Sequence, residues 1–274
     1  QKFMGGAVFS LGLYLVLVAG AELYTGNTML AGAAVDGRIS WGAAVMNWVR
    51  VWLGNFVGAL ALVTLVYFAH VADTGPMAKG MMSIAVGKLS ADWTTIMIKG
   101  ILCNLLVCLG VWVGYAGRTV VDKAVGVVLP VSAFVALGFE HCVANMYFLP
   151  LAFVLKLSGY APEGVPLDVI TIENIVKNLS AATVGNTIAG VVLVLMYWAA
   201  ASRSRRRPRA RRLFSGLKRV PHGLALRKMR ISACTVPCGI INRLFMTPRN
   251  ARRASRACSE LTDVQKKHAG GRNG

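Results

Sequence analysis

Residues 138–147 read GFEHCVANMY, and they interrupt a long apolar run at residues 124–157. The interruption carries Glu140, His141 and Asn145. An ionisable side chain at membrane depth costs about 2.5–3.5 kcal/mol on insertion scales, and such groups usually face a pore or a protein interior. The stretch therefore predicts a polar break inside a membrane segment, where the polar side chains have a function.

A second stretch, residues 20–29 (GAELYTGNTM), has the same frame inside the first apolar run. Three residue types recur at a constant offset of 118, which pairs Gly20 with Gly138, Glu22 with Glu140 and Asn27 with Asn145. Two polar breaks of one design, in two hydrophobic segments, indicate a transport site in a membrane protein.

The composition also indicates a membrane protein, because 55% of the 274 residues are hydrophobic and 15% are charged. Residues 203–274 hold 20 Lys/Arg and two acids, a net charge of +18, whereas residues 1–202 hold ten Lys/Arg and nine acids, a net charge of +1. We expect a transmembrane channel domain at 1–201 and a basic tail at 202–274. We expect this tail to be disordered and to meet anionic lipid headgroups.

Five apolar runs reach or exceed the ~20 residues that a membrane helix needs. They cover residues 3–35, 41–72, 96–115, 124–157 and 179–201, and we expect residues 73–93 to be a loop of mixed composition. The second and fifth runs share a frame at an offset of 131, in which Asn47, Gly54 and Asn55 correspond to Asn178, Gly185 and Asn186.

The first two runs thus resemble the last two, while the third run has no counterpart before the first. The simplest explanation is a three-helix repeat whose first helix is missing from this sequence. Since the chain begins with Gln, we interpret it as a fragment or a trimmed chain. An odd number of helices per repeat gives an inverted repeat. The basic tail predicts a cytoplasmic C-terminus and a multi-pass protein of the cell membrane.

The sequence resembles the formate/nitrite transporter family over nearly all of residues 3–200. Five stretches carry the resemblance: GAELYTGNTM (20–29), WVRVWLGNFVGAL (48–60), KGILCNLLVCLGVWVGYAGRTVVDK (99–123), LPVSAFVALGFEHCVANMY (129–147) and VGNTIAGVVLVLMYW (184–198). It implies an all-α, aquaporin-like bundle of six helices, about five of them present here and two interrupted, assembled as a homopentamer. It also implies one pore per protomer for small monovalent anions such as formate, nitrite, hydrosulfide or lactate.

The resemblance further implies roles for individual residues. The central histidine of the family falls on His141, the pore threonine on Thr25, the pore asparagine on Asn104, and the lysine that attracts anions to the outer vestibule on Lys88. The apolar constrictions fall on Phe9, Leu13, Leu23, Tyr24, Val107 and Phe134, and Tyr24 stands where many members have Phe. The interrupted backbone is then supported by Glu22, Asn27, Glu140 and Asn145.

A small anion loses hydration in a dry neck, so the protein must offer replacement donors. His141 is the one group near the middle of these segments that changes charge close to neutral pH. We hypothesise that His141 donates a proton, or a strong hydrogen bond, to the anion of a weak acid, which then passes as a nearly neutral species. In the alternative interpretations, Thr25 bonds to a preceding carbonyl, Asn104 links helices and Lys88 is a solvated loop charge.

The motifs divide between two substrates. LYTGNTM is similar to nitrite-type members, whereas GYAGRTVVDK and LPVSAFVALGFEH are closer to formate-type members. We expect formate, with nitrite, hydrosulfide or lactate as alternatives.

Other classes of function are also considered. The sequence has no H-E-x-x-H, nucleophile elbow, phosphate loop or Cys/His metal cluster, so we expect no enzyme, no metal and no cofactor. We also expect no specific nucleic-acid partner. Two rivals of another class are an aquaporin-like neutral-solute channel, although no N-P-A motif stands at either break, and a non-conducting assembly subunit.

Overall fold

The computed structural model describes residues 2–71 and 75–206, which form α-helices and no strand. The helices are α1 (Lys2–Ala19), α2 (Tyr24–Asn27), α3 (Leu30–Val35), α4 (Trp41–Phe68), α5 (Gly75–Leu89), α6 (Trp93–Ala116), α7 (Val120–Ala136), α8 (Cys142–Leu157) and α9 (Ile172–Arg206). The predicted all-α class is confirmed. The expected basic tail lies outside the described residues from residue 207 onward.

Several of these helices are long and apolar enough to cross a membrane. Three qualify alone: α4, α6 and the part of α9 at Ile172–Ala201. The pair Phe3–Ala19 and Tyr24–Val35 qualifies together, with a bend of 57° at the break between its two parts. α8 is a shorter apolar helix, and it follows the second break. Both predicted breaks are therefore present.

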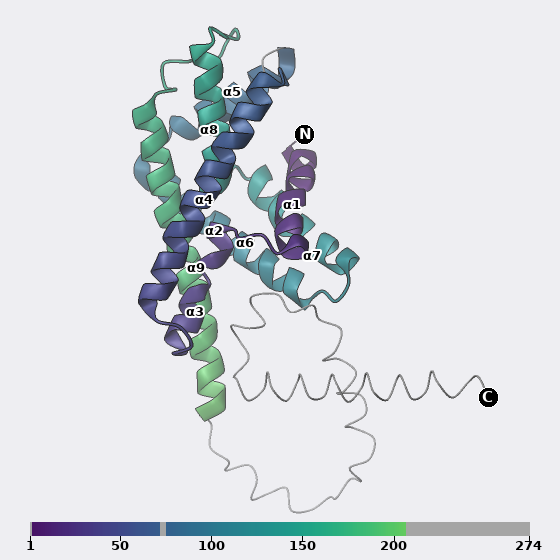
Figure 1. Cartoon of the computed structure of the whole chain (residues 1–274), viewed down its shortest axis with the longest axis vertical. Helices are drawn as coiled ribbons and strands as arrows, with labels where there is room; N and C mark the ends of the chain where they lie inside the picture. Colours follow the sequence, from purple (N-terminus) through teal and green to yellow (C-terminus); the bar gives the residue numbers. More distant parts are fainter. Residues whose placement is uncertain (1, 72–74, 207–274) are drawn as a thin grey trace, which may run out of the picture. The chain divides into compact units, whose positions relative to one another are not determined.

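The helices within residues 1–200 pack in two groups (Figure 1). In one group, α7 packs along α1 and α6, around a core that includes Leu13, Val107 and Phe134. In the other group, α8 packs along α4 and α5, around a core that includes Met82 and Leu149. The short helix α2 contacts α4, α6 and α8, so the first break lies between the two groups.

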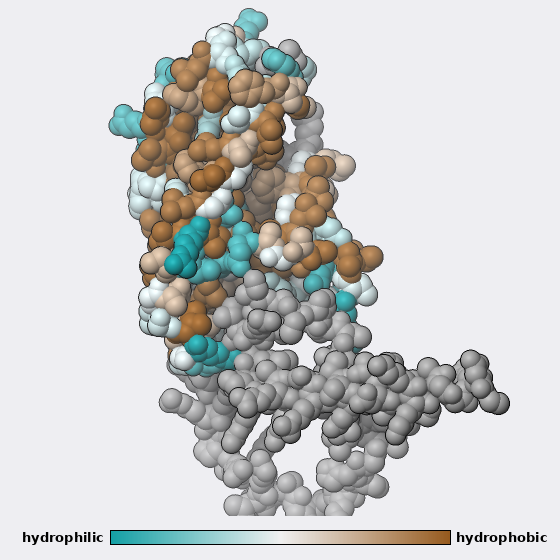
Figure 2. Space-filling model, in the orientation of Figure 1, coloured by the Kyte–Doolittle hydropathy of each residue, from teal (hydrophilic) through white to brown (hydrophobic). Residues whose placement is uncertain are grey.

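Apolar side chains also cover much of the visible outer surface, including the face of α4 (Figure 2). On this helix Leu53, Val57 and Leu65 expose 51%, 65% and 67% of their surface. A soluble protein rarely leaves so large an apolar surface in water, whereas lipid solvates it. The exposed faces and the apolar crossings together make the chain a multi-pass membrane protein.

The expectation of a mixed loop at residues 73–93 is wrong, because most of this stretch is helix α5. Ala78, Met82, Ala85 and Leu89 recur at helical spacing, are at most 1% exposed, and form the face that packs against α8. The helix was not predicted from the sequence because the stretch contains two lysines and has a lower hydropathy than the other runs, while its buried face is only four residues long.

The matched glycines Gly54 and Gly185 have different surroundings in the two halves of the repeat. A Cβ on Gly185 of α9 would overlap the Met97 carbonyl of α6, and Gly100 faces it at the same crossing. Gly54 of α4 stands at the corresponding position, 131 residues earlier, yet a Cβ there would have no atom within 4 Å. Among the described residues, no helix covers α4 where α6 covers α9.

Candidate functional site

Both breaks are built on the same local backbone. Gly20 and Gly138 have φ values of +76° and +68°, a region that glycine enters without steric cost. Leu23 and His141 are then extended, with φ/ψ of −121°/120° and −108°/112°, and each is the N-cap of the helix that follows. Because the backbone leaves the helix here, its N–H and C=O groups need other partners.

Asparagine side chains from the second and fifth apolar runs supply these partners in the same way at each break. Each amide accepts from the N–H two residues after the glutamate and donates to the glutamate carbonyl. The bonds are Tyr24 N to Asn55 Oδ1 (2.9 Å), Asn55 Nδ2 to Glu22 O (3.1 Å), Cys142 N to Asn186 Oδ1 (2.9 Å) and Asn186 Nδ2 to Glu140 O (3.0 Å). The repeat predicted from the offsets of 118 and 131 is thus visible as matched hydrogen bonds.

The glutamate side chains also face matched asparagines. Asn27 donates to Glu22 Oε2 and, at 2.9 Å, to Asn47 Oδ1. In the second half, Asn145 Nδ2 donates to Glu140 Oε2 at 2.6 Å and to Asn178 Oδ1 at 2.7 Å. All four residues named for backbone support therefore lie at the breaks, where these bonds link each carboxylate to the helix that begins beyond it.

The two carboxylates differ in charge balance. Glu140 is 2% exposed, and its Oε2 lies 3.1 Å from Lys88 Nζ at the end of α5. Glu22 is exposed, and no ion pair to it is found among the described residues. The Lys88 side chain keeps 16% exposure, so it is mostly buried against the break and is not a solvated loop charge.

His141 is 6% exposed and is held by both ring nitrogens. Nδ1 accepts from the Ala144 N–H at 3.2 Å, and Nε2 lies 3.1 Å from Thr25 Oγ1. Since Nδ1 accepts, the proton of a neutral ring is on Nε2, which then donates to Thr25. The imidazole also stacks on Phe134, with ring centroids 5.8 Å apart.

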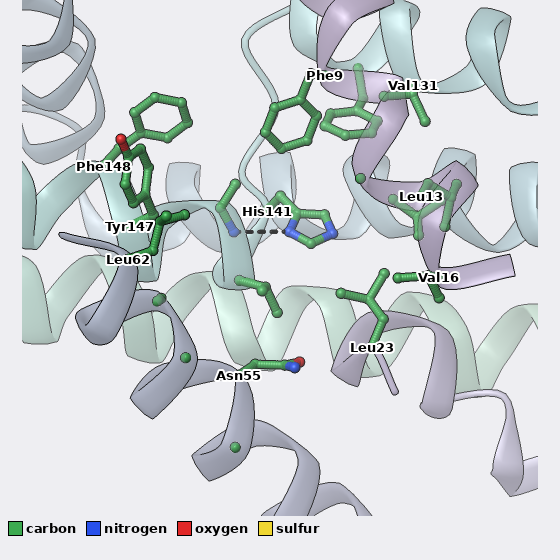
Figure 3. Close-up of a pocket in the computed structure, with 18 of the residues that line it drawn as sticks. Phe9, Leu13, Val16, Leu23, Asn55, Leu62, Val131, His141, Tyr147 and Phe148 are labelled. Carbon is green, nitrogen blue, oxygen red and sulfur yellow. Dashed lines mark hydrogen bonds between the residues drawn. The ribbon is translucent and has the colours of Figure 1, made fainter. Parts of the chain in front are cut away.

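A cavity of about 620 Å³ lies beside this imidazole (Figure 3). In the close-up His141 lies between Phe9 and Leu23, with Leu13 nearby. Five of the six residues expected at constrictions line this cavity: Phe9, Leu13, Leu23, Val107 and Phe134. The lining is otherwise mostly apolar, so the structure brings together an apolar chamber and one imidazole.

Four of the expected pore residues are not in the cavity lining: Thr25, Tyr24, Asn104 and Lys88. Thr25 is 0% exposed, and its hydroxyl contacts His141, which lines the cavity. Asn104 is also 0% exposed, and its Nδ2 donates to Thr25 O (3.2 Å) and Asn186 O (2.6 Å). Asn104 therefore links α6 to the first break and to α9, which is the arrangement of the alternative interpretation.

Some site residues were not assigned a role from the sequence. Asn55 and Asn186 were recognised as matching positions, but their part in the breaks was not predicted. The sequence feature that could have revealed this part is the Gly-Asn pair that occurs at matching positions in both halves, at 54–55 and at 185–186. The part of the chain that the structure describes holds no group of three His, Cys, Asp or Glu side chains suited to a metal ion.

An apolar chamber, two matched helix breaks and several membrane crossings define a membrane channel or transporter. Comparison with known families leads to the same class. The family described as "Formate/nitrite transporter" matches residues 1–200 of this chain. The chain belongs to the formate/nitrite transporter family.

Individual relatives match at similar levels. The chain is 40% identical to the formate channel FocA of Escherichia coli over an alignment of 210 residues that covers 72% of this chain and 73% of that protein. It is 37% identical over 204 residues to the nitrite transporter NirC of Salmonella typhimurium, covering 73% and 72%. A solved pentameric formate channel with formate bound has a TM-score of 0.63 and 34% identity, covering 74% of this chain and 83% of that one.

Proposed function

We propose that this chain is a channel for small monovalent anions of weak acids, with formate as its main substrate, and that it is not an enzyme. The observation that carries the proposal is His141, a buried imidazole in the wall of an apolar cavity. The similarity to formate channel FocA supports formate, and the similarity to nitrite transporter NirC makes nitrite the first competitor to test.

The hydrogen bonds of His141 suggest how an anion is handled. A formate ion that enters the chamber loses water, and the apolar walls do not replace it. The Nε2–H of His141 is a donor that can turn from Thr25 to the anion, and the Thr25 hydroxyl can follow. Transfer of a full proton would require His141 to be protonated at Nδ1 first, which breaks its bond to the Ala144 N–H. We therefore favour the strong hydrogen bond over proton donation.

The remaining site residues have supporting roles in this proposal. Lys88 neutralises Glu140 at the second break and, through its exposed part, attracts anions toward it. Asn104 and the matched asparagines keep the interrupted backbone in register. The protomers assemble as a homopentamer, a state supported by the similarity to the solved pentameric formate channel. Each protomer has one pore, and the protein lies in the cell membrane with its C-terminus in the cytoplasm.

The test is formate flux into liposomes that contain the purified protein, measured at one pH and one formate gradient for all variants. His141→Phe removes the donor and should lower flux at least tenfold. His141→Asn keeps a neutral donor, so it should retain part of the flux. His70→Asn, outside the cavity lining, is the matched control.

Three outcomes would overturn the proposal. A His141→Phe channel that keeps the parental flux contradicts the role of the imidazole. Glycerol or water flux without anion current indicates a neutral-solute channel. The absence of any flux from correctly inserted oligomers indicates a non-conducting subunit. A stronger response to nitrite than to formate in the same liposomes would change the substrate but keep the mechanism.

A further inference from the structure

Tyr24 turns away from the cavity, although both of its neighbours face the site. Leu23 lines the cavity, and Thr25 lies 3.1 Å from His141. The Tyr24 side chain is 5% exposed and packs with Ile96 and Cys142 on the side where α9 lies. Because the three residues are consecutive, a small rotation of Tyr24 also moves Leu23 at the cavity and Thr25 beside His141.

The Tyr24 hydroxyl has a defined direction of donation. Tyr24 Oη lies 2.7 Å from Thr187 Oγ1 of α9, and the Thr187 hydroxyl donates to the Thr183 carbonyl at 2.7 Å. A hydroxyl has one proton, so Thr187 must accept from Tyr24. This chain of two bonds joins residues 163 positions apart in the sequence, and phenylalanine at position 24 could not form it.

One turn of α9 therefore holds both breaks through consecutive residues. Asn186 bonds to Cys142 N and Glu140 O on either side of His141. Thr187 bonds to Tyr24, which precedes Thr25. The two residues of the Thr25–His141 contact are thus held by neighbouring side chains of α9. Asn186 binds the backbone on either side of His141, and Thr187 binds Tyr24, next to Thr25. The helical backbone fixes the spacing of Asn186 and Thr187.

We propose that Tyr24 is a positioning residue whose hydroxyl, bound to Thr187, sets the register between Thr25 and His141. The inference rests on the proposed function for its transport readout, and it goes beyond it by giving a role to a hydroxyl that does not reach the cavity. Without the bond, the residues at 23–25 lose one of the contacts that fix their orientation, and the partner of the His141 Nε2–H is held less firmly.

The test compares Tyr24→Phe, Thr187→Val and the double variant in formate-loaded liposomes. Each single variant should lower maximal flux by about twofold to tenfold, as loss of one neutral hydrogen bond does, with little change in the half-saturating formate concentration. The double variant should be no worse than either single one, because both remove the same bond. Thr187→Ser keeps the hydroxyl and should restore the parental flux and pH profile. Tyr197→Phe, on an exposed tyrosine of α9, is the control.

A second measurement separates this proposal from the proposed function. In protein labelled with ¹⁵N-histidine, the His141 resonances should move in Tyr24→Phe and Thr187→Val and stay in place in Tyr197→Phe. If the parental protein passes no formate, the proposed function fails and the histidine spectra still decide this proposal. Unchanged spectra and flux in Tyr24→Phe, or a Thr187→Ser variant that behaves like Thr187→Val, would overturn it.

Discussion

Two glutamates with the same sequence frame have different surroundings in this protein. Glu140 is buried and is neutralised by Lys88, whereas Glu22 is exposed and has no ion pair among residues 2–71 and 75–206. Their hydrogen bonds to Asn27 and Asn145 are alike, so the two glutamates differ in burial and in charge balance. A buried ion pair contributes little net stability while intact, but it is costly to break on one side.

Removal of the Lys88 charge should therefore be strongly destabilising. Lys88→Met leaves the Glu140 carboxylate buried without a cation, and we expect a loss of about 3–5 kcal/mol in the free energy of unfolding. Lys79→Met, on the exposed side of the same helix, should change stability by less than about 0.5 kcal/mol. Thermal unfolding followed by circular dichroism in detergent measures both. Equal effects of the two substitutions would contradict the assigned role of the pair.

The direction of a single side chain at a break was beyond prediction from the sequence. The resemblance places Tyr24 at a constriction, but the structure turns it toward Thr187. At a helix break the 3.6-residue period is lost, so spacing no longer tells which face a residue occupies. The Lys88–Glu140 pair was equally hidden, because its members are separated by 52 residues and lie in different elements.

At the scale of elements, Asn55 and Asn186 bridge the two breaks in the same way, but they differ in access to water. Water can take over hydrogen bonds lost at a residue beside the cavity, but not at a buried one. Asn186 is 0% exposed and also donates to the Gly100 carbonyl at 2.8 Å, whereas Asn55 lines the cavity. A buried polar group left without a partner costs about 1–3 kcal/mol, and water can satisfy one beside a cavity.

We therefore expect Asn186→Ala to cost about 3 kcal/mol or more and Asn55→Ala about 1 kcal/mol, since Asn186 leaves more buried groups unpaired. Denaturation of the two variants in the same detergent gives the comparison, with Asn174→Ala, an asparagine of α9 outside the breaks, as the control. A larger loss for Asn55→Ala would mean that the first break, not the second, holds the fold.

The start of α6 provides a pH-dependent contribution outside the membrane segment. Asp92 is its N-cap and accepts from the Thr95 N–H at 3.1 Å. Hydrogen bonds from the Thr95 side chain and backbone lower the pKa of Asp92 below its ordinary 3.8. A lowered folded-state pKa means that the carboxylate stabilises the folded protein above the unfolded pKa, and that this contribution is lost as the pH falls through the folded pKa.

Asp92→Ala should consequently be less stable than the parent at neutral pH, and the difference should close as the pH falls below about 4. Thr95→Val removes one of the two bonds and should move this closing point toward higher pH. Melting temperatures measured at half-unit pH steps would show both effects. A difference between parent and Asp92→Ala that is constant with pH would contradict the cap.

Prediction from the sequence worked best for elements that carry their own pattern. Both breaks and the repeat followed from polar residues at constant offsets inside apolar runs. Helix α5 did not, because only four small or apolar residues mark its buried face and its lysines suggest solvent. Its position becomes evident only when α8 is present to cover that stripe.

At the scale of the whole molecule, the exposed apolar faces of α1 and α4 need lipid or other protein around them. Phe3, Val8 and Leu11 on α1 are exposed by 54%, 71% and 56%, and α4 is similar. The proposed homopentamer would cover part of this surface with neighbouring copies, and lipid would cover the rest.

We expect the detergent-solubilised chain to have five times the 29.3 kDa mass of one copy. Native mass spectrometry measures this directly, with protein kept in a mild detergent that preserves contacts between subunits. Glutamate in place of an interface residue should lower the assembly state, whereas the same change on a lipid-facing residue should not. A species of one copy, stable at all concentrations, would exclude the assembly.

The open space beside Gly54 also offers a way to measure the chamber chemically. Gly54 lines the cavity and has no atom within 4 Å of an added Cβ, so a cysteine fits there without moving the backbone. Among the described residues, Cys103, Cys108 and Cys142 are buried and shielded from reagents in water, and Cys234, Cys238 and Cys258 would first be replaced by serine. A series of thiol reagents of increasing diameter, applied from one side of the bilayer and then from the other, would report the size limit for access to the cavity from each side.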